Sequence, residues 1–281
     1  MMSPSKITAS LVLYNTSTDD INRVISCINQ SGVIDTLYVI DNSPLKISNP
    51  YFQLPWINYI HSPENFGYGA GHNIALRSVL DSSRFHFVIN PDIYFEKDQL
   101  ALMISRIEQD QEIGLLMPKV TYSDGQLQYL CKLIPTPFDL LVRRFMIGPF
   151  KGVFSHSAQQ FELRFTGYDR EMNVPYLSGC FMLLSVEALK KVGLFDERFF
   201  MYPEDIDISR RIHRHYKTLF FPGAVVVHDH ARESYKNKKM LWIHVSNLLK
   251  YFNKWGWIFD PERTRINKAV LQKVRNDFKP N

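Results

Sequence analysis

The chain has 281 residues, with 33 Lys and Arg against 28 Asp and Glu, and 45% of its residues are hydrophobic. These proportions exclude a disordered or fibrous protein, and the length suits either two average domains or one large α/β domain with an appendage. The three cysteines are far apart and form no CxxC pair, which argues against a disulfide framework and a thiolate zinc site.

The N-terminus and the apolar runs bear on where the protein is found. One lysine and a short apolar stretch open the chain, and we interpret this stretch as a strand because it lacks the long apolar core of a signal peptide. No apolar run approaches the roughly 18 to 20 residues that cross a bilayer. We therefore expect a cytoplasmic protein, either free or peripheral at the inner face of the cell membrane.

The first ninety residues alternate between strand-like and helix-like spacing of apolar residues. The expected strands are residues 7–14, 36–40, 57–60 and 85–89, and the expected helices are residues 19–30 and 73–80. Because the strands are almost continuously apolar and helical segments alternate with them, the pattern predicts an α/β fold. Its mostly parallel central sheet should have helices on both faces.

The second half of the chain is less regular. Pro and Gly interrupt residues 119–175, which we interpret as an irregular insertion. Regular spacing returns with a strand at 180–185, helices at 186–192 and 205–215, and strands at 218–221 and 224–227. Residues 236–281 hold eleven Lys and Arg against three Asp and Glu, and their apolar residues follow a helical spacing.

Polar residues follow three of the predicted strands at the point where each strand ends. Tyr14 and Asn15 follow the first strand, Asp41 the second, and Asn90 and Asp92 the strand that ends at residue 89. In parallel sheets ligands bind beyond the carboxyl ends of the strands, so this edge is the predicted active site. Asp92 could hold Mg²⁺ or Mn²⁺ against a diphosphate, although a simple strand-ending turn explains the same Asn-Pro-Asp residues.

A glycine-rich segment, ENFGYGAGHN at residues 64–73, precedes a predicted helix. Alternate glycines let the backbone approach a ligand closely, and a helix that begins near Asn73 would offer free N–H groups to an anion. The segment matches neither a Walker A loop nor the dinucleotide fingerprint. A glycine-rich turn that caps the helix explains it equally well.

Two further groups could carry chemistry. Glu204 and Asp205 open a predicted helix beside aromatic residues, where a carboxylate can gain a raised pKa and act as a general base. Acidic residues in a first helical turn also interact favourably with the helix dipole, which requires no catalytic role. His228 follows a buried strand, where a histidine is either a metal ligand or a structural residue.

The order of these motifs resembles glycosyltransferase family 2, whose members are inverting enzymes of the GT-A fold. The succession is LVLYN, VIDNS, ENFGYGAGHNIAL, INPDI, YLSGCFMLL, GLFDERFFMYPEDIDISRRI and AVVVHDHA, and the similarity covers about residues 7–235. It implies a GT-A catalytic domain over residues 1–235 and a basic, Trp-rich helical extension over residues 236–281. The NPD form, the glycine-rich segment and the FDERFFMYPED string look most like rhamnosyltransferases of bacterial O-antigen and cell-wall polysaccharide assembly.

The resemblance implies a role for each matching residue. Asp205 would be the catalytic base, and Glu204 would contact the acceptor. Asp92 and His228 would bind Mg²⁺ or Mn²⁺ together with the donor diphosphate, although Asn90 replaces the first Asp of the family's DXD motif and leaves one charge fewer at the metal. The other expected substrate-binding residues are Asn90 itself, Tyr14 and Asn15 at the nucleotide, Asp41 at the pyrimidine or ribose, and Asn65, Gly69 and Asn73 beside the nucleotide and its sugar.

The same resemblance implies dTDP-L-rhamnose as the donor and a polyprenyl-diphosphate-linked glycan as the acceptor. Two alternatives stay open: a UDP-hexose or UDP-N-acetylhexosamine donor in the same fold, and a non-catalytic glycan-binding scaffold. Nucleic-acid binding is not expected, because residues 1–235 carry a net negative charge and no nucleic-acid motif. The extension, with Trp242, Trp255 and Trp257 among lysines, would either dock on an anionic membrane surface or pack on the catalytic domain.

Overall fold

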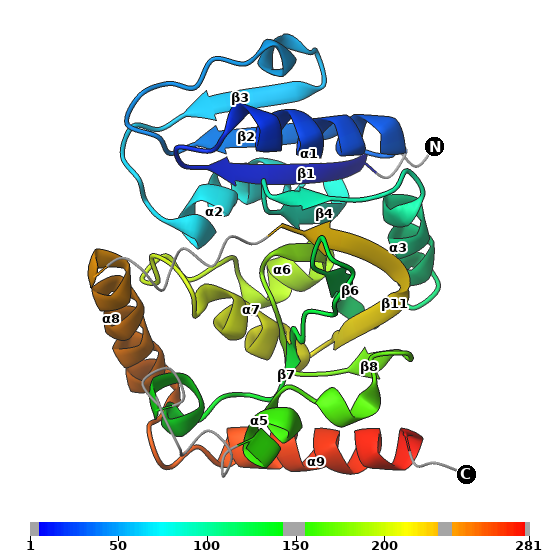
Figure 1. The fold of residues 1–281 in the computed structure, drawn as a ribbon, viewed down its shortest axis with the longest axis vertical. Coiled ribbons are helices and arrows are strands. Elements are labelled where there is room, and N and C mark those ends of the chain that lie inside the picture. The colour runs from blue at the N-terminus through cyan, green and yellow to red at the C-terminus, as the bar shows by residue number, and fades with distance from the viewer. Residues whose placement is uncertain (1–5, 143–154, 230–237, 279–281) are drawn as a thin grey trace.

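The computed structural model describes residues 6–142, 155–229 and 238–278. Its centre is a nine-stranded sheet in the order β3-β2-β1-β4-β10-β6-β11-β5, with β8 paired to β11 (Figure 1). The strands of this sheet are β1 (Lys6–Leu13), β2 (Thr36–Asp41), β3 (Ile57–His61), β4 (Ser83–Ile89), β5 (Ile93–Tyr94), β6 (Ile113–Thr121), β8 (Met172–Asn173), β10 (Phe181–Ser185) and β11 (Lys217–His228). A separate two-stranded sheet pairs β7 (Cys131–Lys132) with β9 (Tyr176–Leu177).

Most of the long strands of the sheet are parallel to one another. Strand β1 pairs in parallel with β2 and β4, β2 with β3, and β6 with β11. Strand β10 is antiparallel to both β4 and β6, so β6 and β11 run in the same direction as β4. The mostly parallel central sheet expected from the sequence is confirmed, and the carboxyl ends of these parallel strands meet at one edge.

Helices cover both faces of the sheet, as the sequence predicted. Helices α1 (Thr18–Ser31) and α3 (Gln99–Glu108) pack on one face. The other face carries α2 (Tyr68–Val79), α6 (Val186–Val192) and α7 (Glu204–His213), and α9 (Pro261–Asp277) adds buried side chains to the same apolar cluster from the end of the molecule (Figure 1). Shorter helices are η1 (Pro50–Gln53), η2 (Phe138–Val142), α5 (Ser155–Phe161) and η4 (Arg164–Thr166).

Helix α1 shows how the local sequence sets the boundaries of an element. The Ser17 hydroxyl accepts a hydrogen bond from the Asp20 N–H and so caps the N-terminus, and Gly32, with φ of 67°, ends the helix in the left-handed conformation. Between these caps the buried residues recur at helical spacing and face the sheet, as expected for an amphipathic helix: Ile21, Val24, Ile25 and Ile28.

The glycine-rich segment differs from the prediction. Helix α2 begins at Tyr68 rather than near Asn73, so Gly69 and Gly71 lie inside the helix and only Gly67 is a turn residue. A Cβ atom on Gly71 would stand 2.8 Å from a methyl carbon of Val12 in β1. The glycines therefore allow close packing of the helix on the sheet, which outweighs their low helix propensity.

Two further boundaries differ in the second half of the chain. Residues 217–228 form one strand, β11, instead of two, and its register with β6 shifts between Phe221 and Val225, where Pro222 lacks an N–H for the ladder. Strand β6 extends into the segment expected to be irregular. Residues 143–154 of that segment lie outside the described residues.

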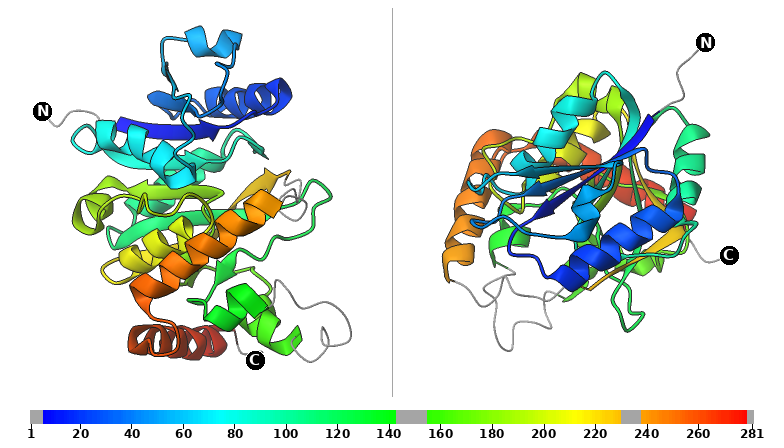
Figure 2. Two further views of the ribbon diagram at one scale, coloured as in Figure 1. Left: turned by 90° about the vertical axis from the view of Figure 1, so that its left-hand side faces the viewer. Right: turned by 90° about the horizontal axis from the view of Figure 1, so that it is seen from above.

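The C-terminal extension packs on the body of the protein. Helix α8 (Lys238–Trp255) lies across α7, and α9 crosses the end of the molecule farthest from β3 (Figures 1 and 2). Their buried side chains are Leu248, Tyr251 and Phe252 in α8, and Ile266, Val270 and Val274 in α9. Of the two alternatives left open for the extension, packing is what the described helices show. Among those helices, none combines the length and the apolar content needed to span a membrane.

Candidate active site

The structure brings Asp92 and His228 together at the predicted edge of the sheet. The two-residue strand β5 pairs antiparallel with the end of β11, so that Ile93 stands opposite His228. This pairing places Asp92 Oδ1 3.3 Å from His228 Nε2. Burial opposes a charge on the imidazole, but Cys180 and Asp92 outweigh it and raise the pKa of His228 to about 10. Since only the neutral imidazole is a metal ligand, a cation bound at this point would compete with that proton.

The Asp92 and His228 pair fits a shared divalent cation. The carboxylate oxygen and the imidazole nitrogen stand near enough to hold one cation together, and both are donor types that Mg²⁺ or Mn²⁺ accepts. Among the described residues no group of three or more His, Cys, Asp or Glu side chains forms a complete metal site. A cation held by this pair would take its other oxygen ligands from water or from a bound diphosphate, the usual arrangement for Mg²⁺.

Glu204 and Asp205 open helix α7, and both are buried. The Asp205 carboxylate accepts hydrogen bonds from the Gly179 N–H at 3.0 Å and from the Ile206 N–H at 2.8 Å, which fix its orientation. Burial raises the pKa of Asp205 to about 6, although the Gly179 N–H and Lys132 oppose the shift. Burial, followed by the charge of Asp205, also raises the pKa of Glu204 well above its usual value.

Tyr68 lies between the Glu204 and Asp205 pair and the Asp92 and His228 pair. Its hydroxyl donates to the carbonyl of Gly179 at 2.6 Å, beside the N–H that orients Asp205. Burial raises the pKa of the Tyr68 phenol well above its usual value, and four acidic neighbours raise it further. These neighbours are Cys180, Glu204, Asp205 and Asp92. Asp92 and the Glu204 and Asp205 pair therefore all lie near the Tyr68 phenol.

The turn before α2 faces the segment that leads into α7. Gly67 has φ of 98°, and a Cβ atom there would stand 2.1 Å from the carbonyl oxygen of Phe200, so only glycine fits. The next N–H, of Tyr68, donates to that same carbonyl at 2.9 Å. A side chain does not fit at position 69 either, since a Cβ atom on Gly69 would lie 2.9 Å from the Cβ of Phe195. The glycines thus bring the N-terminus of α2 against the active-site segment.

Asp41 is turned into the protein. Its carboxylate is 0% exposed and accepts hydrogen bonds from the Ser43 N–H, the Ile47 N–H and the Tyr59 hydroxyl at 3.0, 2.8 and 2.6 Å. Burial opposes its charge, but these donors outweigh that effect and lower the pKa of Asp41. The side chain therefore orders the loop after β2 through its hydrogen bonds.

Of the other residues expected at the nucleotide, Tyr14, Asn15 and Asn65 lie at the end of β1 or in the turn before α2, whereas Asn73 lies inside α2. Tyr14 is half exposed, and Asn15, with φ of 49°, donates its N–H to the Ser43 hydroxyl, so both stand at the open end of β1. Asn65 caps the glycine turn by accepting from the Gly67 N–H at 3.0 Å. Asn73 instead lies within α2, where its amide bonds the backbone N–H and carbonyl of Phe195 and the carboxylate of Glu197. It holds α2 to the segment before α7.

Three residues at this edge were not predicted as site residues. Asn42 is 1% exposed, and its Oδ1 has no hydrogen-bond partner among the described residues. Tyr68 and Gly179 orient the carboxylate pair as described above. The position of Asn42 directly after a strand was a usable signal, whereas the contact between Gly179 and Asp205 joins residues 26 positions apart and has no local sequence signal. A second histidine, His230, follows His228 in the sequence but lies outside the described residues.

A family model for glycosyl transferase family 2 matches residues 11–193. The match covers more than half of the chain, so the chain belongs to this family and is a glycosyltransferase.

Named relatives of the chain are distant. The low-salt glycan biosynthesis hexosyltransferase Agl10 of Haloferax volcanii is 27% identical over 208 residues, which cover 73% of this chain and 61% of Agl10. The N-acetylglucosaminyl-diphospho-decaprenol L-rhamnosyltransferase of Mycobacterium tuberculosis is 25% identical, with 64% of this chain and 61% of that protein covered. Rhamnosyltransferase WbbL of Escherichia coli is 25% identical, with 66% and 70% covered. The chain thus spans less than two thirds of the first two relatives.

Solved structures share the fold over nearly the whole chain. GalNAc-T7 with UDP, GalNAc and Mn²⁺ matches with a TM-score of 0.59 and 13% identity, over 97% of this chain and 55% of that chain. The mannosyltransferase PcManGT of Pyrobaculum calidifontis, in complex with GDP-Man and Mn²⁺, matches with a TM-score of 0.57 and 12% identity, over 100% and 77%. These likenesses establish the GT-A-like fold.

Proposed function

We propose that this chain is an inverting rhamnosyltransferase. It transfers L-rhamnose from dTDP-L-rhamnose to a hydroxyl of a polyprenyl-diphosphate-linked glycan in bacterial O-antigen or surface-polysaccharide assembly. The observation that carries the chemistry is the Asp205 carboxylate, which is buried, has a raised pKa and is oriented by the Gly179 N–H beside the Asp92 and His228 pair. The choice of rhamnose is supported by two relatives whose names describe rhamnosyltransferases.

Asp205 is the general base of the proposed reaction. Its carboxylate removes the proton from the acceptor hydroxyl as the hydroxyl oxygen forms a bond to the anomeric carbon of the donor. The bond from that carbon to the diphosphate breaks on the opposite face, so a single displacement inverts the configuration and a β-linked donor gives an α-rhamnoside. Glu204, next to the base, has a raised pKa and can therefore stay protonated and donate to an acceptor oxygen.

Asp92 and His228 hold the cation in this account. Their Oδ1 and Nε2 atoms supply two ligands, and the donor diphosphate supplies others. When bound, Mg²⁺ or Mn²⁺ neutralises charge that develops on the leaving diphosphate. Asn90 stands where a second carboxylate would add charge, and its buried Oδ1 has no hydrogen-bond partner among the described residues, so we assign it to the substrate.

The donor nucleotide lies across the open ends of β1 and β2 in this proposal. Tyr14 and Asn15 line one side, and Asn42 offers a buried amide oxygen that lacks a partner among the described residues. Asn65 and Gly69 shape the turn and first helical residues beside the sugar. These placements bring polar side chains and close-approaching backbone together at one edge of the sheet.

The outer face of α8 is proposed to contact the membrane that carries a lipid-linked acceptor. Trp242 and Leu249 lie two helical turns apart and are 74% and 42% exposed, so they share one outward face. Lys250 and Lys254, expected at an anionic surface, instead bond inward to the Arg198 carbonyl and to Asp196. Co-sedimentation with phosphatidylglycerol vesicles should fall for Trp242→Ala, and unchanged sedimentation would contradict this contact.

Donor binding tests the proposed function. Calorimetric titration of dTDP-rhamnose, UDP-glucose and UDP-N-acetylglucosamine, with and without Mn²⁺, should show a metal-dependent preference for dTDP-rhamnose. A preference for a UDP-sugar would keep the fold and the base but assign another donor, and the hexosyltransferase relative makes a hexose the first candidate. Absence of binding by every donor would favour a glycan-binding scaffold.

A further inference from the structure

Helix α8 contacts the segment that leads into Glu204 and Asp205. The amide of Asn247 donates to the Met201 carbonyl at 3.0 Å. One turn earlier in α8, the His244 ring stands edge-on to the Tyr202 ring, with centroids 4.5 Å apart and planes at 81°. Both contacts therefore fall within three residues of the catalytic pair.

The backbone at Tyr202 is in an unfavourable conformation. Its φ is 89°, in the region that favours glycine, and side-chain-bearing residues stay there only where their surroundings hold them. The following residue, Pro203, caps the N-terminus of α7, and Glu204 and Asp205 are the first residues of that helix. The orientation of the two carboxylates thus depends on a turn whose unfavourable backbone conformation must be stabilised by its neighbours.

The support comes from two sides. On one side, the Tyr68 N–H at the start of α2 donates to the Phe200 carbonyl. On the other side, Asn247 bonds the next carbonyl along the chain, that of Met201. Asn247 is 1% exposed and follows the helical spacing of the buried apolar face of α8, where a polar side chain is costly unless it is bonded. Its amide is therefore placed for this contact.

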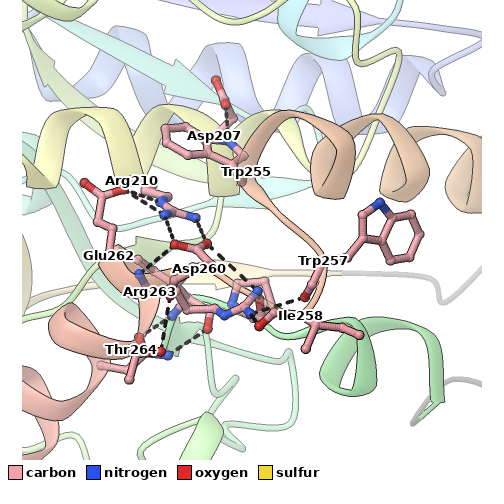
Figure 3. Close-up of polar contacts among 12 residues, drawn as sticks. Asp207, Arg210, Trp255, Trp257, Ile258, Asp260, Glu262, Arg263 and Thr264 are labelled. Carbon is pink, nitrogen blue, oxygen red and sulfur yellow. Dashed lines mark hydrogen bonds and ion pairs between the residues drawn. The ribbon is translucent and has the colours of Figure 1, made fainter.

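The lower part of α7 is fixed to the extension as well. Asp207, which is 0% exposed, accepts from Lys254 Nζ at 2.6 Å and from the Trp255 indole N–H at 2.8 Å. Figure 3 shows Arg210 between Asp260 and Glu262 at the start of α9. This anchorage holds the body of α7, so a displacement of the turn would fall on the first residues of the helix, Glu204 and Asp205.

We propose that Asn247 is a positioning residue for the transfer reaction, and that it holds the Met201 to Pro203 turn so that Asp205 faces the acceptor hydroxyl. This inference rests on the proposed function of Asp205 as the base. Asn247 touches neither substrate in this account, and it acts through the backbone of Met201. In this proposal the C-terminal extension therefore contributes to catalysis through Asn247.

Two substitutions separate this role from a general loss of stability. Asn247→Leu keeps the volume of the side chain in an apolar setting but removes the N–H donor, and Asn247→Ala removes both. Ser246→Ala, on the exposed side of the same helical turn, is the matched control. Each variant is compared with the wild type in kcat, in acceptor KM, in the Kd for dTDP and in hydrogen exchange of the peptide that spans residues 198–206.

Asn247→Leu should lower kcat by about tenfold to a hundredfold, because a small misplacement of a catalytic group has effects of that size. The Kd for dTDP should stay within twofold, and exchange in residues 198–206 should accelerate while exchange in β1 and β4 does not change. A kcat within twofold of the wild type, or unchanged exchange, overturns the proposal. Should the wild type turn over no donor at all, the proposed function fails, and the exchange data still decide whether Asn247 holds the turn.

Discussion

Asp92 Oδ1 lies 3.3 Å from His228 Nε2, although the two residues are 136 positions apart in the sequence, and a two-residue strand pairing brings them together. If this pair holds the cation, Asp92→Asn and His228→Gln should each remove the gain in dTDP-rhamnose affinity that Mn²⁺ produces in the wild type. Loss of a metal ligand should weaken metal-dependent binding by about tenfold or more. Calorimetry with and without EDTA measures the effect.

The control for the metal prediction is Asp229→Asn, because Asp229 follows His228 in the chain but is exposed and faces Arg23. It should keep the Mn²⁺ effect. Equal losses in all three variants would mean that general negative charge, and not the Asp92 and His228 pair, is responsible.

The raised pKa of Asp205 predicts an acidic limb in the rate profile. A general base works in its deprotonated form, so kcat/KM should fall as the pH falls through about 6. Below that limb the slope should approach about one decade per pH unit for a single group. A profile of kcat/KM from pH 4.5 to 8.5 at saturating metal tests this. A rate that is independent of pH between 5 and 7 would exclude Asp205 as the base.

Ser10 links two buried histidines through hydrogen bonds, and removal of its hydroxyl is predicted to lower the stability of the protein. The Ser10 hydroxyl contacts His72 Nδ1 at 2.7 Å and His86 Nε2 at 2.8 Å, and Thr8 contacts the other nitrogen of His86. Ser10→Ala leaves two buried ring nitrogens without this partner, at a cost of about 1–3 kcal/mol in the free energy of unfolding for each unsatisfied group. Urea unfolding measures the change, with Ser78→Ala on the exposed face of α2 as the control.

The same histidines predict the direction of the pH dependence of stability. Burial lowers the pKa of His86 to about 3 and that of His72 well below its usual value, so both stay neutral in the folded protein. The unfolded chain binds protons below about pH 6.5, and the folded chain does not. The contribution of these two residues to stability should therefore be full above that pH and decline as the pH falls toward 3. Because Asp205 and Glu204, with raised pKa values, contribute in the opposite direction, the wild type is compared with His86→Gln. An equal pH dependence of the free energy of unfolding in the two proteins between pH 6.5 and 4.5 would contradict the neutrality of His86.

The ion pair between Arg210 and Asp260 predicts that the extension unfolds together with the sheet. Arg210 is 1% exposed, makes two bonds to Asp260 at 2.7 and 2.8 Å, and lies 4.0 Å above the Trp255 ring (Figure 3). Breaking such a buried pair from one side should cost about 3–5 kcal/mol. Arg210→Met and Asp260→Leu should each lower the thermal midpoint, and the double variant should recover part of the loss.

The number of thermal transitions of the wild type also tests whether the extension unfolds together with the sheet. A single cooperative transition is expected, because the contacts of α8 and α9 cross from the extension into both α7 and the core. Two separate transitions would mean that residues 236–281 form an independent unit.

Part of the site could be predicted from the sequence, because its residues lie at the ends of predictable strands and helices. Asp92, Asp205 and His228 follow or precede elements with clear apolar spacing, and a parallel sheet necessarily gathers its carboxyl ends at one edge. The element types around them were therefore predictable, and so was the edge. The helical role of Gly69 was not, because a glycine that permits close packing and a glycine in a turn look the same in one sequence.

The tertiary contacts of the site have no local signal. The family resemblance implies that Asp41 binds the pyrimidine or ribose, and no local sequence signal shows that Ser43, Ile47 and Tyr59 surround its carboxylate. The contact between Asn247 and Met201 likewise joins residues 46 positions apart. Such contacts follow from packing of whole elements, which apolar spacing alone cannot specify.

The measurement that tests the account most directly is transfer of rhamnose by the wild type and by Asp205→Asn. dTDP-L-rhamnose is the donor and a polyprenyl-diphosphate-linked N-acetylglucosamine is the acceptor, with the dTDP affinity of both proteins measured alongside. We predict an α-rhamnoside from the wild type, a loss of turnover of about a hundredfold or more in Asp205→Asn, as expected for removal of a general base, and an unchanged dTDP affinity. Turnover that survives in Asp205→Asn, or a product with retained anomeric configuration, would contradict the central claim that Asp205 is the base of an inverting transfer.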